Sequence, residues 1–186
     1  KEELSQEKIE QLQGRQWLNQ IGLSTAILSA LAAIAAMQAG TLANEGMMAQ
    51  IRSTDLWNLY QARSTKSHVQ ESTVRLLQAL QKPVPATITA EINKLGQQQQ
   101  ENQTEARKLE LESQLNMHRH ELFARSVAAL QIGISLGAVA ALLRKKSVWY
   151  LGLGIAAIGV SFMIVGTAPQ AHKISFGEQP HQYQGS

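Results

Sequence analysis

The residue types most suggestive of catalysis lie between Ser53 and His68, in the stretch STDLWNLYQARSTKSH. This stretch contains Asp55, Ser64 and His68, the three residue types of a hydrolytic triad. Their spacing is helical, however, and one helix cannot converge three such side chains on a single substrate. We therefore predict no catalytic residue and expect a protein without enzymatic activity.

Aromatic and basic residues in the same stretch are suited to packing or to protein binding instead. Trp57, Tyr60 and Ser64 are spaced by three and four residues, so they share one helix face, and Arg63 lies beside them. Trp, Tyr and Arg are the residue types that most often anchor protein interfaces. The interpretation we favour is that the aromatic pair packs beside a neighbouring helix. The alternative is a partner-binding patch of these four residues.

Methionine and histidine residues form a second group with possible chemistry, comprising Met48, Met117, His118 and His120. Thioether and imidazole ligands suit copper, so a copper-handling membrane protein is the alternative function. Surface histidines and packing methionines explain the same residues without a metal. The chain has no cysteine, which excludes thiolate metal sites and cysteine nucleophiles. It also has no phosphate-binding loop or nucleotide fingerprint, and we predict no cofactor.

Three apolar segments are long enough to cross a bilayer, which requires about 20 residues. We predict transmembrane helices at 17–43, 124–143 and 148–168, with the lipid bilayer as a partner. Trp149 and Tyr150 open the third segment, where an interfacial aromatic belt is expected. A soluble bundle of three buried helices is the alternative. It is disfavoured because soluble helices rarely stay uncharged over such a length.

Small residues recur at every fourth position in these segments, a pattern that lets helix backbones approach closely. The predicted helix-packing residues are Ala32, Ala36, Gly40, Ala129, Gly133, Gly137 and Gly152. No ionisable residue lies within the apolar stretches 21–42, 127–143 and 148–168 of these spans, which argues against a proton-coupled transporter or an ion channel. Gln38 and Gln131 are the large polar residues well inside, and we expect them to hydrogen-bond between helices.

The polar region 44–123 between the first two spans has heptad spacing in two arms separated by a Pro-x-Pro corner at 82–85. In the first arm, the residues at this spacing are Leu59, Ala62, Lys66, Val69, Thr73, Leu76 and Leu80. Folding the chain at Val84 pairs Leu76 with Ile92 and Ala62 with Ala106. We therefore predict an all-α membrane protein with a long antiparallel coiled-coil-like hairpin between its first and second spans.

The charged segments predict the orientation. Arg144, Lys145 and Lys146 form most of a basic loop at 144–147, which the positive-inside rule places in the cytoplasm. The N-terminus is then cytoplasmic, while the hairpin and C-terminus are periplasmic or lumenal. Arg52, Arg119 and Arg125 oppose this orientation, because they flank the membrane on the hairpin side.

The two ends of the chain are polar. Segment 1–16 is expected to be a polar helix, and 169–186 a flexible tail. Because the chain begins with Lys1 rather than methionine, we expect further residues upstream. The net charge of +3 is too small to suggest nucleic-acid binding.

The first span and the segment after it carry a family resemblance. The stretch WLNQIGLSTAILSALAAIAAMQAGTLANEGMMAQ, followed by an aromatic pair and Tyr60-Gln61-Ala62-Arg63-Ser64, resembles domain-of-unknown-function family 4337. Arg63 stands where that family pattern has lysine, which keeps the charge and changes the hydrogen-bonding geometry. The resemblance implies a bacterial membrane protein with several spans, in the inner or an intracellular membrane. It assigns no catalytic residue.

Together these features predict a non-enzymatic integral membrane scaffold, oligomeric assembly or accessory subunit of a larger complex. The helical hairpin would provide protein–protein contacts. The expected partners are further copies of the chain or other membrane-protein subunits, with no nucleic acid and no small-molecule substrate.

Overall fold

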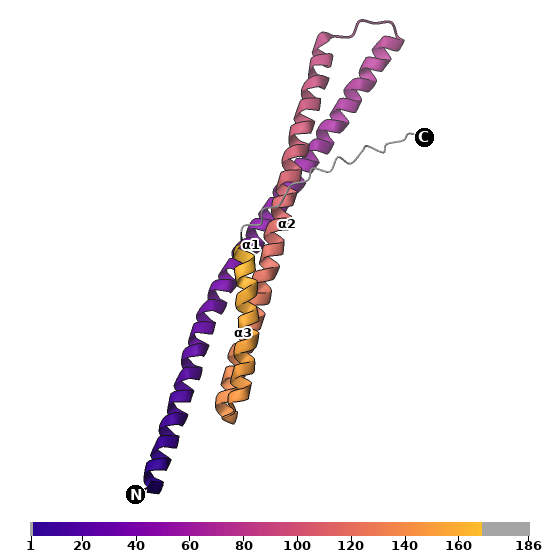
Figure 1. Cartoon of the computed structure of the whole chain (residues 1–186). Coiled ribbons are helices and arrows are strands. Elements are labelled where there is room, and N and C mark those ends of the chain that lie inside the picture. Colours follow the sequence, from indigo (N-terminus) through magenta and orange to yellow (C-terminus); the bar gives the residue numbers. More distant parts are fainter. Residues whose placement is uncertain (1, 169–186) are drawn as a thin grey trace.

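The computed structural model describes residues 2–168, and side chains from residue 14 onward. Three helices follow one another: α1 (Glu2–Ala79), α2 (Ala86–Leu143) and α3 (Lys146–Thr167). α1 and α2 form a long antiparallel hairpin, and α3 lies along the half of it that is remote from the turn (Figure 1). The described residues include no strand, which confirms the all-α fold.

α1 passes from the first apolar segment into the polar arm without a break. No proline occurs before Pro83, so every backbone N–H of the helix is available to its ladder. At a rise of about 1.5 Å per residue, such a helix is on the order of 120 Å long. The predicted polar helix 1–16 is therefore the beginning of α1 rather than a separate element.

The connection at the tip of the hairpin is longer than predicted. α1 ends at Ala79, and residues 80–85 are non-helical, whereas the predicted turn was 82–85. Gln81 has a φ of 52°, and Pro85 is the N-cap of α2 with an extended backbone. Because Pro83 and Pro85 lack N–H groups, neither can continue the ladder of α1. The two arms diverge as they approach this connection (Figure 1).

The connection between α2 and α3, in contrast, is shorter than predicted. Arg144 adopts a left-handed conformation with a φ of 51°, and Lys145 leads directly into α3. Two residues, rather than the predicted 144–147, thus reverse the chain. The predicted flexible tail, 169–186, lies outside the described residues.

All three helices contain stretches long and apolar enough to span a membrane, with mean hydropathies of 1.7, 2.0 and 2.1. In this region α2 lies against both other helices, whereas the backbones of α1 and α3 come close at few points and these two helices meet mainly through side chains. Phe123 packs against Ala35, Ala39 and Leu42 of α1. The other two clusters of buried residues are Leu130 with Ala32 and Ala156, and Ala140 with Trp17 and Ile21.

The face that the first arm presents to α2 differs from the predicted one. The residues that face α2, called here the inner seam, are Ser53, Leu56, Tyr60, Arg63, Ser67, Gln70, Val74 and Leu77. The predicted seam residues, called here the outer stripe, are Leu59, Ala62, Lys66, Val69, Thr73, Leu76 and Leu80. The outer stripe is exposed, so the first-arm prediction was wrong by one residue, about 100° around the helix.

The pairing register also differs from the prediction. Ser53 Oγ donates to the carbonyl of Ala106 at 2.9 Å, although Ala62 was the expected partner. Near the tip, Gln70 Nε2 donates to Glu91 at 2.9 Å. α1 is therefore displaced by seven to nine residues from the expected pairing. The displacement arises because the heptad spacing in the arm would let either the outer stripe or the inner seam of α1 face α2. Packing in the apolar half is compatible with the inner seam alone.

Candidate interaction site

Trp57 and Tyr60 form an aromatic pair in the part of the arm that is nearer to the apolar half than to the tip. Their ring centroids are 5.6 Å apart and the planes meet at 79°, an edge-to-face arrangement. Both side chains are half-buried in the single chain. Tyr60 belongs to the inner seam, so part of its surface packs against α2, and the remainder is available to a partner.

Arg63 and Ser64 continue this site toward the tip. Arg63 Nη1 donates to the carbonyl of Gln98 on α2 at 3.3 Å. Ser64 Oγ lies 3.5 Å from His68 Nδ1. The same ring nitrogen lies 2.7 Å from the Ser64 carbonyl oxygen. The four predicted partner-binding residues thus occupy consecutive turns of one helix, and Arg63 joins them to the second arm.

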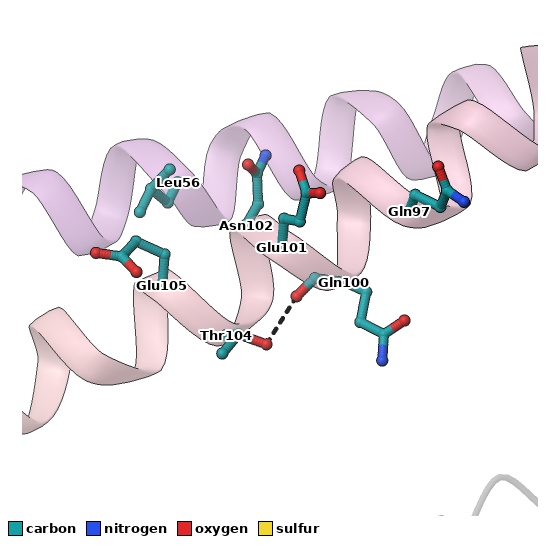
Figure 2. A pocket seen from close by; sticks show the side chains of 7 residues that line it. All are labelled: Leu56, Gln97, Gln100, Glu101, Asn102, Thr104 and Glu105. Carbon is teal, nitrogen blue, oxygen red and sulfur yellow. Dashed lines mark hydrogen bonds between the residues drawn. The ribbon is translucent and has the colours of Figure 1, made fainter.

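A shallow groove lies between α1 and α2 at Leu56, the residue before Trp57 (Figure 2). Leu56 contributes from α1, and the remaining lining residues come from α2: Gln97, Gln100, Glu101, Asn102, Thr104 and Glu105. Asn102 Nδ2 is buried there without a hydrogen-bond partner. Thr104 Oγ1 donates to the Gln100 carbonyl at 2.9 Å. Six of the seven lining residues are polar and the groove is open, so it lacks the enclosed apolar walls of a typical small-molecule site.

Glycine residues allow α2 and α3 to approach backbone to backbone. A Cβ added at Gly133 would lie 2.9 Å from the Gly152 carbonyl oxygen and from Ala156 Cβ. A Cβ at Gly159 would lie 3.0 Å from the Ser126 carbonyl oxygen and 3.1 Å from Ala129 Cβ. Glycine is therefore required at both positions, because any side chain would force the helices apart.

The predicted helix-packing residues divide between this interface and the outside. Ala129, Gly133 and Gly152 lie between α2 and α3, whereas Ala32 and Gly137 lie between α1 and α2. Ala36 and Gly40 face outward, and no atom of the described chain lies within 4 Å of a Cβ built on Gly40. Gln38 and Gln131 are also exposed in the single chain.

The proposed metal ligands are not gathered as the predicted register required. His120 Nδ1 donates to the carbonyl of Ala39 at 2.8 Å. Ala39 precedes Met48 by nine residues, about 13 Å along a helix, so His120 does not face Met48 as expected. Met117 packs over Gly46, and His118 is exposed. Among the described residues, no three His, Cys, Asp or Glu side chains form a group suited to a metal ion.

Two contacts at the hairpin end of α3 were not predicted. Arg119 Nε donates to the Gly166 carbonyl at 3.0 Å, which satisfies one of the free carbonyls at the end of α3. Phe123 covers the same glycine, since a Cβ there would lie 3.0 Å from the ring. Arg119 and Phe123 are four residues apart on one helix face, and this spacing is the signal that sequence reasoning missed.

Trp149 is a second unpredicted anchor, at the opposite end of the spans. Its Nε1 donates to Ser24 Oγ on α1 at 3.2 Å, and the ring packs on the cluster that contains Trp17. The aromatic-belt prediction concerned its position in the membrane interface, and the tertiary hydrogen bond adds a direct link between α3 and α1.

An ion pair joins the arms near the tip. Lys66 Nζ lies 2.6 Å from Glu91 Oε1, and Gln70 donates to the other carboxylate oxygen. The hydrogen bond from Lys66, together with its positive charge, lowers the pKa of Glu91 below its ordinary value. The pair is well exposed, so its contribution to stability is small.

The profile of a family described as "Domain of unknown function (DUF4337)" matches residues 17–169, from the first buried tryptophan to the end of α3. No curated protein and no solved structure matches the chain. The matched region contains all three apolar helix segments and the complete hairpin. Because the match extends over most of the sequence, the chain belongs to the DUF4337 family.

Proposed function

We propose that the protein is a non-enzymatic scaffold or accessory subunit of a bacterial membrane complex, with its hairpin as the interaction arm. The observation that carries this proposal is the continuity of α1 from the membrane-type segment into the arm. A partner held by the arm would be held at a defined distance and orientation from the bilayer. The half-buried Trp57, Tyr60 and Arg63 supply the residue types that anchor such contacts.

The proposed location is the bacterial inner membrane or an intracellular membrane, with the N-terminus cytoplasmic and the arm periplasmic or lumenal. The basic residues Arg144, Lys145 and Lys146 at the opposite end from the arm support this orientation. Arg119, which counts against it by charge alone, is engaged with the Gly166 carbonyl and has a packing role that explains its position.

Native mass spectrometry of the full chain, extracted in a mild detergent, tests the proposal. We expect masses of an assembly, either several copies or a stoichiometric complex with another protein. A Trp57→Ala/Tyr60→Ala variant should reduce the assembled fraction, whereas Tyr150→Ala, an exposed aromatic at the other end of the molecule, should not. A chain that is monomeric in every preparation and has no co-purifying protein would contradict the proposal.

A further inference from the structure

The outer stripe of α1 leaves large apolar side chains uncovered along the arm. Leu59 is 47% exposed, and Val69, Leu76 and Leu80 are 61%, 60% and 58% exposed. These residues lie beyond the membrane-type segment, in the polar part of the chain. Together with Ala62, Lys66 and Thr73 they form the outer stripe, whose alternating three- and four-residue spacing is the pattern that a second helix covers in a coiled coil.

We propose that the outer stripe pairs with the same stripe of a second copy, with the two α1 helices parallel and in register. This inference rests on the proposed function and specifies its partner as another copy of the chain. The resulting assembly would place the two α1 helices at the centre and an α2 helix on either side.

The position of the stripe beside an existing interface supports this arrangement. Ala62, Val69 and Leu76 each precede an inner-seam residue by one position, namely Arg63, Gln70 and Leu77. The two heptad faces are therefore adjacent on α1, separated by about 100° around the helix. A helix with two adjacent heptad faces can pack two neighbours at once, and α2 already occupies one of them.

The membrane determines the orientation of the second copy. Two copies inserted in the same direction have α1 helices that run the same way. An antiparallel pairing of the arms would require the arms to lie on opposite sides of the bilayer. The accessible pairing is therefore parallel, related by a two-fold axis along the membrane normal.

The order of layers in the stripe makes it complementary to itself. In register, Leu59, Val69 and Leu76 of α1 each meet the same residue of the second copy, so apolar layers meet apolar layers. The polar layers, Lys66 and Thr73, likewise meet themselves. A shift by one heptad would place Lys66 against Leu59 or Thr73. A stripe with this order favours in-register self-pairing over a displaced one.

The lysine layer is neutralised within each hairpin. Lys66 Nζ lies 2.6 Å from the Glu91 carboxylate of its own second arm. In the pair, this layer would contain two lysines and two glutamates, so the charges balance. A polar layer of this type lowers coiled-coil stability but selects register and copy number.

Gln38 provides an independent observation inside the apolar segment. It precedes Leu59 by 21 residues, three whole heptads, so it shares the heptad position of Leu59. Its side chain faces outward from the three-helix unit, toward lipid. Parallel pairing would bring Gln38 opposite its counterpart, where the two amides can hydrogen-bond. Glu45 and Arg52 share the position between them; both are exposed and both follow the C-terminal end of the apolar segment.

Single-cysteine variants test the pairing, because the chain has no native cysteine. Val69→Cys, Leu76→Cys and the control Gln78→Cys are oxidised in lipid vesicles. Gln78 is also exposed and lies two residues from Leu76, on the side of α1 away from the stripe. We expect disulfide-linked homodimers from Val69→Cys and Leu76→Cys, at least about tenfold more than from Gln78→Cys, because only facing residues approach within disulfide range.

A second pair of variants avoids dependence on disulfide chemistry. Val69→Lys/Leu76→Lys should reduce the dimer fraction in native mass spectrometry at least about tenfold, because like charges would face each other across the pair, whereas Gln78→Lys should leave it unchanged. Dimers that form equally from all three cysteine positions, or from none, overturn the inference. If cysteine dimers are absent while an assembly or partner complex persists, the stripe assignment fails and the proposed function stands. A monomer in both experiments contradicts both.

Discussion

The apolar half of the α1–α2 hairpin and its polar arm are built from the same two helices but hold together differently. In the apolar half, Phe123 is 1% exposed and fills the space over Ala35 and Ala39. In the arm, buried apolar side chains such as Leu95 are fewer, and single polar contacts, such as Arg63 with the Gln98 carbonyl, also join the helices. The helices diverge toward the tip (Figure 1). Close side-chain packing holds the apolar half, whereas sparser packing and separate hydrogen bonds hold the arm.

This difference teaches where the register of the hairpin is determined. A phenylalanine over two alanines fits in one position, because a displaced helix would meet larger side chains. Polar contacts to backbone carbonyls, in contrast, are available at every turn of a helix. The inner seam continues the heptad frame of the small residues in the span, from Ala32, Ala35 and Ala39 through to Gln70. The arm thus follows a register set within the membrane.

The largest effect is expected from Phe123→Ala. Loss of this buried ring should lower the free energy of unfolding by about 3–5 kcal/mol, because the space over Ala35 and Ala39 would be left empty. Leu142→Ala on the same helix is the control, since its side chain is 84% exposed to lipid. Steric-trapping measurements in bicelles check both. Equal losses for the two variants would contradict shape-based packing in this half.

A smaller loss is expected from Gly152→Ala. The added methyl group would lie 3.0 Å from the Gly133 carbonyl oxygen and from Leu136 Cβ, so α3 must shift away from α2. We expect a cost of about 1–3 kcal/mol. Gly154→Ala, two residues later on an open face, should be neutral or slightly stabilising, because alanine favours the helix. Thermal unfolding of both variants in detergent provides the comparison.

The sequence was sufficient for the architecture and for one of the two arm faces. Apolar length predicts the three spans, and the heptad spacing of Leu95, Ala106 and Leu109 correctly places the α2 face. On α1, the outer stripe is more apolar than the inner seam, which contains Ser53, Arg63 and Ser67, so hydrophobicity selected the wrong face. The correct face is recognised only by extending the heptads from the span.

The candidate site was predictable in composition but not in geometry. Trp57 and Tyr60 are recognisable as anchors from their types and spacing. The separation of His120 from Met48 follows from the register, which the arm sequence does not determine. The spacing of Arg119 and Phe123 places both on one face of α2, but the bond from Arg119 to the end of α3 also depends on how far α3 returns along α2, a tertiary feature.

Arg119→Gln tests the hydrogen bond that joins α2 to the end of α3, where the apolar half meets the arm. Loss of the charge-assisted hydrogen bond to the Gly166 carbonyl should cost about 1 kcal/mol, because the C-terminal carbonyl of α3 loses its donor. Amide hydrogen exchange should become faster in the last turns of α3. Arg107→Gln, an exposed arginine of the arm, is the control. Unchanged exchange at residues 160–167 would show that the capping contact is dispensable.

The smallest effect is expected at the tip, from acidification. Lys66 lowers the pKa of Glu91 through a hydrogen bond and its charge, so the carboxylate stabilises the folded arm above the ordinary glutamate pKa of about 4. This contribution should be lost as the pH falls through the lowered pKa. Amide hydrogen exchange in the first turns of α2 should then become faster as the pH falls from about 5 to about 3. In Glu91→Gln this pH dependence should disappear, while the apolar half remains unaffected.

The most direct test of a register determined within the membrane is a comparison of two double-cysteine variants in the intact chain. Ser53→Cys/Ala106→Cys joins residues that meet across the inner seam, where the Ser53 hydroxyl is 2.9 Å from the Ala106 carbonyl oxygen. Ala62→Cys/Ala106→Cys joins the residues that apolar spacing alone would pair. We predict rapid intramolecular disulfide formation in the first variant and none in the second. A cross-link between positions 62 and 106, without one between 53 and 106, would contradict the account.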